Sequence, residues 1–268
     1  MNSENPIGVF DSGIGGLTVA HAINQSLPEE KIVYFGDTQH LPYGNKSSNK
    51  IIYYSEKITD FLLMKKCKAI VIACNSASSI AFKKLVKKTN GKCLLFNVVK
   101  PVVKAIIDNR LIKNVGVIGT NATISTNIYK ESIIKKRPDI TVSSLPTPLL
   151  ASLIEEDNNE LYEKGIIDSY LKNEKLKNID TLILGCTHYP LIKAQILNYY
   201  KKNVNLLSVL KYIGPEIKEK LEAANLLTKK TTYPQHHFYV SDYTHHFQEK
   251  TKLFFPDGII LKEENIFS

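Results

Sequence analysis

The stretch Lys68–Ser76 reads KAIVIACNS, and the rest of the chain can be interpreted from it. Its apolar run, Ala69–Ile72, is typical of a buried parallel strand. Cys74 follows the run, and Asn75 and Ser76 are residue types that begin helices. The cysteine is therefore predicted at the carboxyl end of a strand and just before a helix, where open α/β sheets bind their ligands.

A second stretch, Asp180–His188, repeats this pattern as DTLILGCTH. An apolar run again leads into a cysteine, Cys186, and Thr187 and Pro190 are helix-start residues. One such cysteine would be interpreted as a small buried hydrophobe. Two cysteines in the same setting favour a functional interpretation. A helix amino terminus also favours the thiolate form of each cysteine.

The two stretches belong to a longer internal repeat. Val115–Thr120 (VGVIGT) mirrors Ile7–Ser12 (IGVFDS), with matching glycines 108 residues apart (116 − 8). Cys186 follows Cys74 by 112 residues (186 − 74). Near-equal offsets indicate an internal duplication.

We therefore predict an α/β protein with two similar parallel-sheet domains, related by pseudo-twofold symmetry, and an active site in the cleft between them. The chain after Leu207 contains further helix and strand patterns for which the second repeat has no place. We predict that this tail returns to the first domain. The first domain then comprises residues 1–98 plus 209–268, and the second comprises residues 99–208.

Composition excludes several classes of protein. The chain of 268 residues has a net charge of +9, but only Arg110 and Arg137 are arginines among its 35 basic residues. Arginine is the main residue for reading bases and gripping phosphates, so a solvated lysine-rich surface is favoured over specific nucleic-acid binding. No apolar run approaches a membrane span, and the start MNSENP has no signal-peptide character. We expect a cytoplasmic protein with no membrane partner.

The remaining cysteines and the histidine pairs do not predict a metal site. The four cysteines form no C-x-x-C pair, so a zinc site or a disulfide framework is not expected. Cys67 and Cys93 are interpreted as core or partly exposed thiols. The pairs His236-His237 and His245-His246 are adjacent in sequence, unlike helical ligands, and are interpreted as surface histidines.

Two α/β halves that face each other would place Cys74 and Cys186 on opposite walls of one cleft. One sulfur could then remove a proton from a carbon atom while the other returns a proton from the far side. Cysteine suits both tasks because its pKa can be brought near the working pH. The result is inversion of a stereocentre without a cofactor.

Five motifs follow one another in an order that is specific as a set: Phe10–Gly16, Pro42–Gly44, Ala73–Ser76, Gly119–Thr123 and Gly185–Pro190. In these motifs the chain resembles the glutamate racemases of the aspartate/glutamate racemase superfamily. The resemblance implies interconversion of L- and D-glutamate by two cysteine bases, with no cofactor and no metal. It also implies supply of D-glutamate for peptidoglycan, and so for cell-wall biogenesis and cell shape, and a homodimer.

The resemblance also implies which residues act. The catalytic set is Cys74, Cys186, Asp11, His188 and Glu155. The substrate-binding set is Asp11, Ser12, Tyr43, Gly44, Asn75, Ser76, Thr187 and His188. Asp11 can bind the substrate ammonium or act on Cys74, and His188 can support Cys186. Glu155 resembles a further acidic residue of the family near the second cysteine.

Two departures from the family and three alternatives remain. Ser76 stands where family members often have threonine, and Leu207–Lys211 lacks an expected acidic residue.

An aspartate or other amino-acid racemase is one alternative. A non-catalytic anion-binding protein is another, although both cysteines are present. An NAD-dependent oxidoreductase would fit the glycine loop and Asp37, but Thr18 stands where a third glycine or alanine would be expected, and Asp11 would face the pyrophosphate. Asp37 is interpreted as a strand-end hydrogen-bonding residue and is left out of the site.

Overall fold

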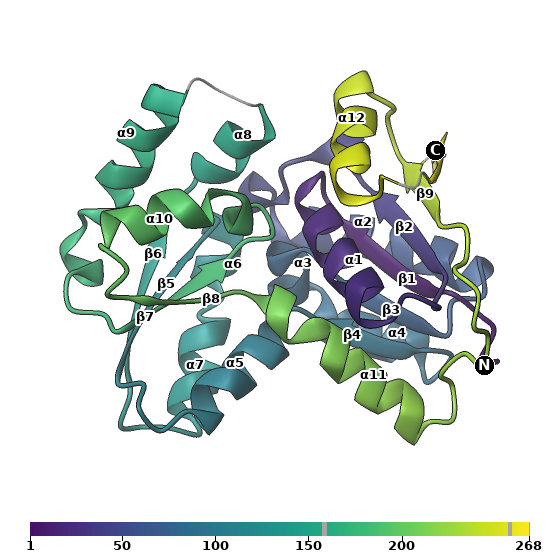
Figure 1. Ribbon diagram of the computed structural model, residues 1–268, viewed down its shortest axis with the longest axis horizontal. Coiled ribbons are helices and arrows are strands. Elements are labelled where there is room, and N and C mark those ends of the chain that lie inside the picture. The colour runs from purple at the N-terminus through teal and green to yellow at the C-terminus, as the bar shows by residue number, and fades with distance from the viewer. Residues whose placement is uncertain (157–159, 257–258, 268) are drawn as a thin grey trace.

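The computed structural model describes residues 1–156, 160–256 and 259–267, and its strands form two separate parallel sheets (Figure 1). The first sheet has the order β10-β9-β2-β1-β3-β4 and the second has the order β6-β5-β7-β8. The strands are β1 (Ile7–Asp11), β2 (Ile32–Gly36), β3 (Ala69–Ile72), β4 (Leu94–Asn97), β5 (Asn114–Gly119), β6 (Thr141–Pro146), β7 (Thr181–Gly185), β8 (Asn205–Leu207), β9 (His237–Val240) and β10 (Ile260–Glu263).

The internal repeat is visible in the strand order. In the first sheet β1 lies between β2 and β3, and β4 flanks β3. In the second sheet β5 lies between β6 and β7, and β8 flanks β7. Each strand of one set thus has a counterpart in the other, which confirms the prediction of two similar parallel-sheet α/β domains.

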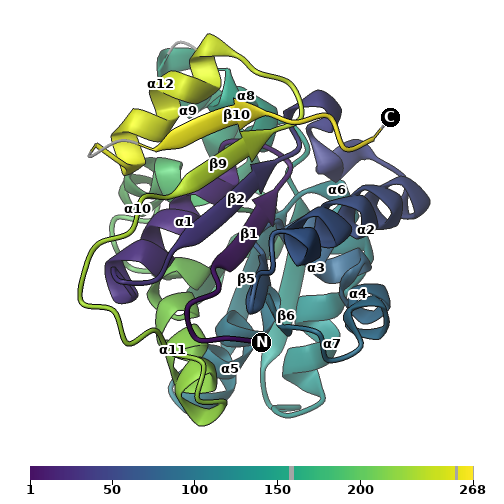
Figure 2. The same cartoon turned by 90° about the vertical axis from the view of Figure 1, so that its right-hand side faces the viewer.

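The tail of the chain joins the first sheet. Strand β9 pairs with β2 and β10 pairs with β9, as Figure 2 shows along one edge of the molecule. Helix α11 (Ile213–Ala223) packs against α1 (Gly15–Ser26). The predicted return of the tail is thus seen in the sheet, whereas the exact limits 1–98 plus 209–268 and 99–208 stay a prediction.

Alternating side chains divide the core of the first domain into two layers. Val9 and Val71 pack with α1, α11 and α12 (His245–Phe254) on one face of the sheet. Phe10 and Ile70 point to the opposite face, where they pack with α2 (Ser48–Met64) and α4 (Phe82–Thr89). This alternation is the two-residue period of a strand, and it explains why both faces of β1 and β3 are apolar.

Two helical stretches of the chain are interrupted. The helix after Cys74 divides at Ala81 into α3 (Asn75–Ile80) and α4. The helices α6 (Asn121–Ser125) and α7 (Ile128–Ile134) are separate, because Asn127 between them adopts a left-handed conformation with φ of 54°. The other helical segments are α5 (Val99–Asp108), α8 (Leu150–Glu155), α9 (Glu160–Leu171), α10 (Lys193–Tyr199), η1 (Thr38–His40), η2 (Tyr43–Asn45), η3 (Glu174–Leu176), η4 (Tyr189–Ile192) and η5 (Val209–Lys211).

Polar side chains at the carboxyl ends of the two sheets contact each other. Ser76, after β3, lies 2.9 Å from Thr120, after β5, measured between hydroxyl oxygens. The Thr18 hydroxyl of α1 donates to the carbonyl oxygen of Thr187, after β7, at 3.2 Å. The ends of the central strands therefore meet at a polar junction between the two domains.

Candidate active site

Cys74 lies at this junction on the wall formed by the first domain. It follows β3 and precedes α3, as the sequence predicts, and only 5% of the residue is exposed. Its sulfur lies 3.9 Å from the Ser12 hydroxyl oxygen and accepts the backbone N–H of Ala77. Ser12 comes from the loop after β1, so two neighbouring strand ends build the surroundings of this thiol.

The surroundings of Cys74 favour the protonated thiol. Burial raises the pKa of Cys74, and the nearby carboxylate of Asp11 raises it further. The helix N–H from Ala77 and the Ser12 hydroxyl oppose this shift but are weaker. The helix start acts on Cys74 in the predicted direction, but burial and the Asp11 carboxylate outweigh it, so the net shift favours the thiol.

Cys186 occupies the equivalent position on the opposite wall, directly after β7, and is also buried. Its sulfur lies 3.6 Å from Nδ1 of His188. The other ring nitrogen of His188, Nε2, contacts the carboxylate oxygen Oε2 of Glu155. Glu155 ends α8, and its second oxygen accepts the backbone N–H of Ile14 from the first domain at 3.2 Å. A sulfur, an imidazole and a carboxylate thus form a chain of contacts.

This chain of contacts holds a charged pair. Burial alone would lower the pKa of His188, but the Glu155 carboxylate and the Cys186 sulfur raise it well above its ordinary value. Burial alone would raise the pKa of Glu155, but the charge and hydrogen bond of His188 and the Ile14 N–H lower it. The raised pKa favours the imidazolium form of His188, and a positive charge on this ring would lie where it stabilises negative charge on the adjacent sulfur.

Asp11 has one oxygen without a partner in the described part of the chain. The carboxylate ends β1 and is fully buried. Oδ2 accepts backbone N–H groups from Gly13 at 3.2 Å and Gly16 at 2.8 Å. Oδ1 has no hydrogen bond there. Burial raises the pKa of Asp11, and the nearby charge of Glu155 adds to the rise although His188 opposes it. A buried, unsatisfied carboxylate oxygen calls for a donor from a bound molecule, and an ammonium group is such a donor.

Hydroxyl groups from both domains gather beside the cysteines. The Ser76 hydroxyl oxygen lies 2.9 Å from that of Thr120 and 3.4 Å from that of Thr123. All three side chains are buried. Asn75 accepts a hydrogen bond from the hydroxyl of Tyr129 at 2.6 Å. Such clustered neutral donors can bind a carboxylate.

The remaining predicted residues surround the same junction. Gly44 lies against Thr120, so closely that a Cβ at position 44 would stand 2.6 Å from the Thr120 Cβ. Gly15 of the glycine loop approaches Thr187 and His188, and a Cβ there would stand 2.5 Å from the Thr187 hydroxyl. These contacts require glycine because there is no room for a side chain. The glycine loop is thus used for close packing of the two domains.

The sequence matches a family of known racemases. The family model for Asp/Glu/Hydantoin racemases matches residues 7–209. The chain belongs to this family. It is therefore a racemase, an isomerase that inverts a stereocentre.

Individual members of the racemase family resemble the chain over nearly its whole length. A protein from Neisseria meningitidis serogroup B named glutamate racemase is 39% identical over 244 residues, which are 90% of this chain and 89% of that protein. The crystal structure of glutamate racemase from Francisella tularensis in complex with D-glutamate has a TM-score of 0.90 and 36% identity, with 99% of each chain covered. The isoform RacE1 from Bacillus anthracis has a TM-score of 0.91 and 30% identity, with 98% of each chain covered.

The structure brings the sequence-predicted residues together and adds others. Asp11 ends a strand of the first sheet, and Ser12, Cys74, Asn75 and Ser76 follow strands of that sheet. Cys186, Thr187, His188 and Glu155 belong to the second domain. Thr120, Thr123 and Tyr129 contact this set but were not among the predicted site residues. The internal repeat aligns Thr120 with Ser12, and that signal could have identified it. Tyr129 has no comparable sequence signal.

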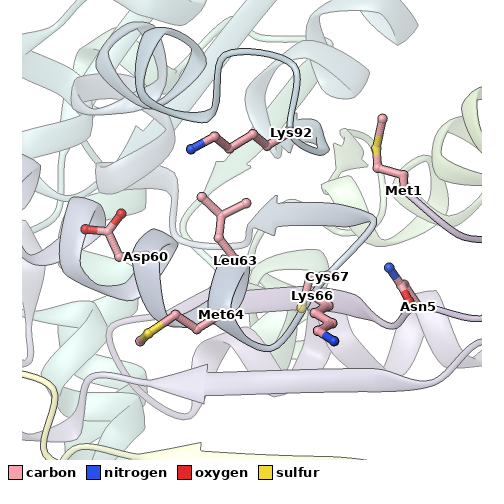
Figure 3. Close-up of a pocket in the computed structure, with 8 residues that line it drawn as sticks. All are labelled: Met1, Asn5, Asp60, Leu63, Met64, Lys66, Cys67 and Lys92. Carbon is pink, nitrogen blue, oxygen red and sulfur yellow. The ribbon is translucent and has the colours of Figure 1, made fainter.

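The cavity in Figure 3 lies away from this junction. It has a volume of about 500 Å³ and is lined by Met1, Asn5, Asp60, Leu63, Met64, Lys66, Cys67 and Lys92. It includes the residues just before β3, at the amino end of the first sheet, where parallel sheets rarely bind substrates. Burial raises the pKa of Cys67 to about 12 and that of Cys93 to about 11, and both thiols belong to the hydrophobic core of the first domain.

The histidine pairs require one correction. His236 is buried, although adjacent histidines were interpreted as surface residues. Its Nδ1 accepts the backbone N–H of Ile32 at 3.2 Å, and its Nε2 lies 3.0 Å from the side-chain oxygen of Asn24.

Within residues 1–156, 160–256 and 259–267, no three potential ligands among His, Cys, Asp and Glu gather as a metal site would require. In the same residues no helix combines the length and the apolar character needed to span a membrane.

Proposed function

We propose that this protein is a cofactor-independent glutamate racemase in which Cys74 and Cys186 act as the two bases. One observation carries the proposal. Two cysteines at equivalent positions of a duplicated fold lie on opposite walls of one junction, and each has an acid–base partner of its own. Inversion of a carbon centre needs acid–base groups on its two opposite faces.

Glutamate as the substrate is supported by the relatives. The Neisseria and Francisella proteins are named glutamate racemases, and the Francisella structure contains D-glutamate. The local chemistry agrees with an α-amino acid that carries a second carboxylate. Asp11 Oδ1 can accept a hydrogen bond from the ammonium group. The hydroxyls of Ser76, Thr120 and Thr123 and the amide of Asn75 are available to the carboxylates.

The reaction consists of two proton transfers. The thiolate of one cysteine takes the Cα proton, and the electron pair of the broken C–H bond remains on the substrate as a carbanion delocalised into its carboxylate. The thiol of the other cysteine then donates its proton to the opposite face of Cα. Each turnover leaves the two sulfurs with exchanged protonation states, so a proton must return through solvent or through His188 before the same enantiomer reacts again.

The partners of each sulfur have distinct tasks in this scheme. The imidazolium of His188, held by Glu155, stabilises the thiolate of Cys186 before it takes a proton. Asp11 lies near enough to Cys74 to disfavour its thiolate, and it also has the free oxygen that an ammonium would occupy. A bound ammonium would offset the negative charge of Asp11 and thereby make ionisation of Cys74 easier.

We further propose that the product D-glutamate supplies peptidoglycan synthesis, and so cell-wall biogenesis and cell shape, in the cytoplasm. We also propose that the protein acts as a homodimer, the commonest symmetric assembly. Light scattering of the purified protein tests the dimer. A single species of 30.2 kDa at working concentration would contradict it.

The test of the activity is chiral chromatography of purified protein incubated with L-glutamate, D-glutamate or L-aspartate, without added cofactor and with a metal chelator. We expect both glutamate enantiomers to reach the same equal mixture. Turnover of aspartate in preference to glutamate would support the aspartate racemase alternative. No turnover of any amino acid would contradict the proposal.

A further inference from the structure

Asp37 is a buried carboxylate beside the candidate active site that has no part in the reaction described above. It follows β2 directly and has no exposed surface. Its backbone N–H donates to the carbonyl oxygen of Asp11 at 2.9 Å, so it is the immediate neighbour of the site on the next strand. The family comparison and the sequence motifs assign it no function.

Three side chains donate hydrogen bonds to this carboxylate. The Tyr43 hydroxyl donates to Oδ2 at 2.6 Å. The Ser241 hydroxyl, from the segment after β9, donates to Oδ1 at 2.8 Å. His40 Nδ1 lies 2.8 Å from the same oxygen. Asp37 therefore ties the end of β2 to the C-terminal part of the sheet and to η2, the turn that contains Tyr43 and Gly44.

The hydroxyl of Tyr43 is thus already bonded to Asp37. The Tyr43 side chain is 1% exposed, so it serves as an anchor for the turn. Gly44, the next residue, lies against Thr120 of the second domain, and Thr120 in turn contacts Ser76. The position of the turn in the site consequently depends on the anchor at Asp37.

Aromatic side chains hold the His40 part of this arrangement in place. The His40 ring stacks on Tyr54 of α2, with centroids 4.1 Å apart and planes at 20°. Phe267 packs edge-on against the same ring at 4.7 Å. His40 therefore has little freedom to leave Asp37, and the carboxylate is held from three sides.

We propose that Asp37 is a positioning residue, which acts through Tyr43 to hold the Tyr43–Gly44 turn against Thr120 in the geometry that binds the substrate. The inference rests on the proposed racemase function, because it is expressed through substrate binding. Asp37 itself touches no reacting group. Its removal releases the turn, and small displacements of positioning groups weaken binding strongly.

The test compares Asp37→Ala, Asp37→Asn and Tyr43→Phe with wild type in glutamate racemisation assays. For Asp37→Ala we expect KM to rise about tenfold or more in both directions, with a smaller change in kcat, because a buried hydrogen bond to a charged group is lost. Asp37→Asn should recover much of the loss, since an amide can still accept from Ser241 and donate to the Tyr43 oxygen. Tyr43→Phe should raise KM similarly, and the Asp37→Ala/Tyr43→Phe double variant should be little worse than either single variant.

The matched control is Asp180→Ala. The Asp180 carboxylate accepts backbone N–H groups of Lys113 at 2.8 Å and Asn114 at 2.7 Å, at the amino end of β7 and therefore far from the cleft. We expect it to lower the melting temperature and to leave KM unchanged. Dissociation constants for D-glutamate from calorimetry should follow the KM values.

The outcomes separate this inference from the proposed function. An active wild type with unchanged KM in Asp37→Ala, or in Tyr43→Phe if the alanine variant does not fold, would overturn the inference and leave the racemase proposal intact. Equal KM increases in Asp180→Ala and Asp37→Ala would also overturn it, because they would indicate general destabilisation. A wild type that racemises no glutamate would overturn the proposed function and this inference with it.

Discussion

Cys74 and Cys186 occupy equivalent places in two equivalent sheets, yet their surroundings differ. Cys74 has the Ser12 hydroxyl and the Asp11 carboxylate beside it, and burial and the carboxylate favour its protonated form while the hydroxyl opposes them more weakly. Cys186 has the His188 ring beside it, and that ring, whose pKa is raised, is held by a second carboxylate, Glu155. The duplicated backbone thus places two sulfurs symmetrically, and the side chains around them then break the symmetry.

The difference shows what each half of a duplicated fold contributes. Removal of a proton from one face and delivery to the other requires one thiolate and one thiol at the same time. Two sulfurs with identical surroundings would show no preference for which of them carries the proton. Burial and the Asp11 carboxylate raise the pKa of Cys74, so in the proposed mechanism the unequal surroundings favour Cys74 as the thiol of the pair.

The largest effect is expected from the cysteines themselves. Cys74→Ser and Cys186→Ser should each lower racemisation by about 10³-fold or more, because a hydroxyl is a poor base near neutral pH. In heavy water the wild type should place solvent deuterium at Cα of the inverted product. Each serine variant should still exchange the Cα proton of one enantiomer only, and the enantiomer should differ between the two variants.

Cys93→Ser is the control for the cysteine variants, since Cys93 is also buried but lies outside the site. It should retain racemisation. If Cys74→Ser or Cys186→Ser kept activity near that of wild type, the two-base assignment would be wrong. Transfer of the substrate proton into product would instead indicate a single base that reaches both faces.

The next largest effect is expected at Glu155, which supports only the wall that carries Cys186. In Glu155→Gln the amide would donate towards His188 Nε2, which favours the neutral ring. Because the Glu155 carboxylate is what raises the pKa of His188, this pKa should fall, and the high-pH limb of the kcat/KM profile should move to lower pH by about one unit or more. Glu156→Gln, at the exposed neighbouring position, should leave the profile unchanged. An unshifted profile in Glu155→Gln would remove His188 from the support of Cys186.

The equivalent positions of Cys74 and Cys186 could be predicted from the sequence, because the patterns that indicate them are local. The apolar runs before Cys74 and Cys186 define strands, and the equal spacing of the repeat defines two matching sheets. The contacts of Asp37 and of Tyr129 were not accessible, because they join segments far apart in the chain. The left-handed turn at Asn127 was missed for a different reason: asparagine tolerates that conformation without requiring it.

His236 was misjudged because neighbouring residues of an extended chain point to opposite sides. Its partner in sequence, His237, is half-buried and contacts Lys31, whereas His236 points inward to Ile32 and Asn24. Adjacent polar residues at the start of a strand therefore do not share one environment, and only the pairing of β9 with β2 decides which of them is buried.

His188 and His236 should respond to pH in opposite senses. Burial lowers the pKa of His236 from 6.5 to about 4, so its contribution to stability is present above about pH 6.5 and is lost as the pH falls towards 4. The loss should be on the order of 2 kcal/mol. The pKa of His188 is raised, so its contribution is present below pH 6.5 and is lost as the pH rises through the folded-state value.

Urea unfolding at a series of pH values tests this contrast. His236→Gln should flatten the decline of the free energy of unfolding between about pH 6.5 and pH 4, because glutamine can accept from the Ile32 N–H without titrating. His245→Gln is the control at an exposed histidine and should leave the decline as in wild type. An unchanged decline in His236→Gln would show that other groups cause the acid sensitivity.

The smallest effect is expected at Ser76, the position where this chain departs from the family's threonine. Ser76→Thr keeps the hydroxyl beside Thr120 and Thr123 and should change kcat/KM by no more than about threefold. Ser76→Ala removes the hydroxyl and should raise KM about five- to tenfold, because a buried hydrogen-bond partner of Thr120, which in the proposed function also binds the substrate, is lost. Ser79→Ala, on the same helix, removes a hydroxyl that bonds only the Asn75 carbonyl within the described residues and should leave KM unchanged. If Ser76→Thr were as harmful as Ser76→Ala, the added methyl group would not fit the polar junction. The serine would then be required by the packing of this chain and would not be a neutral exchange for threonine.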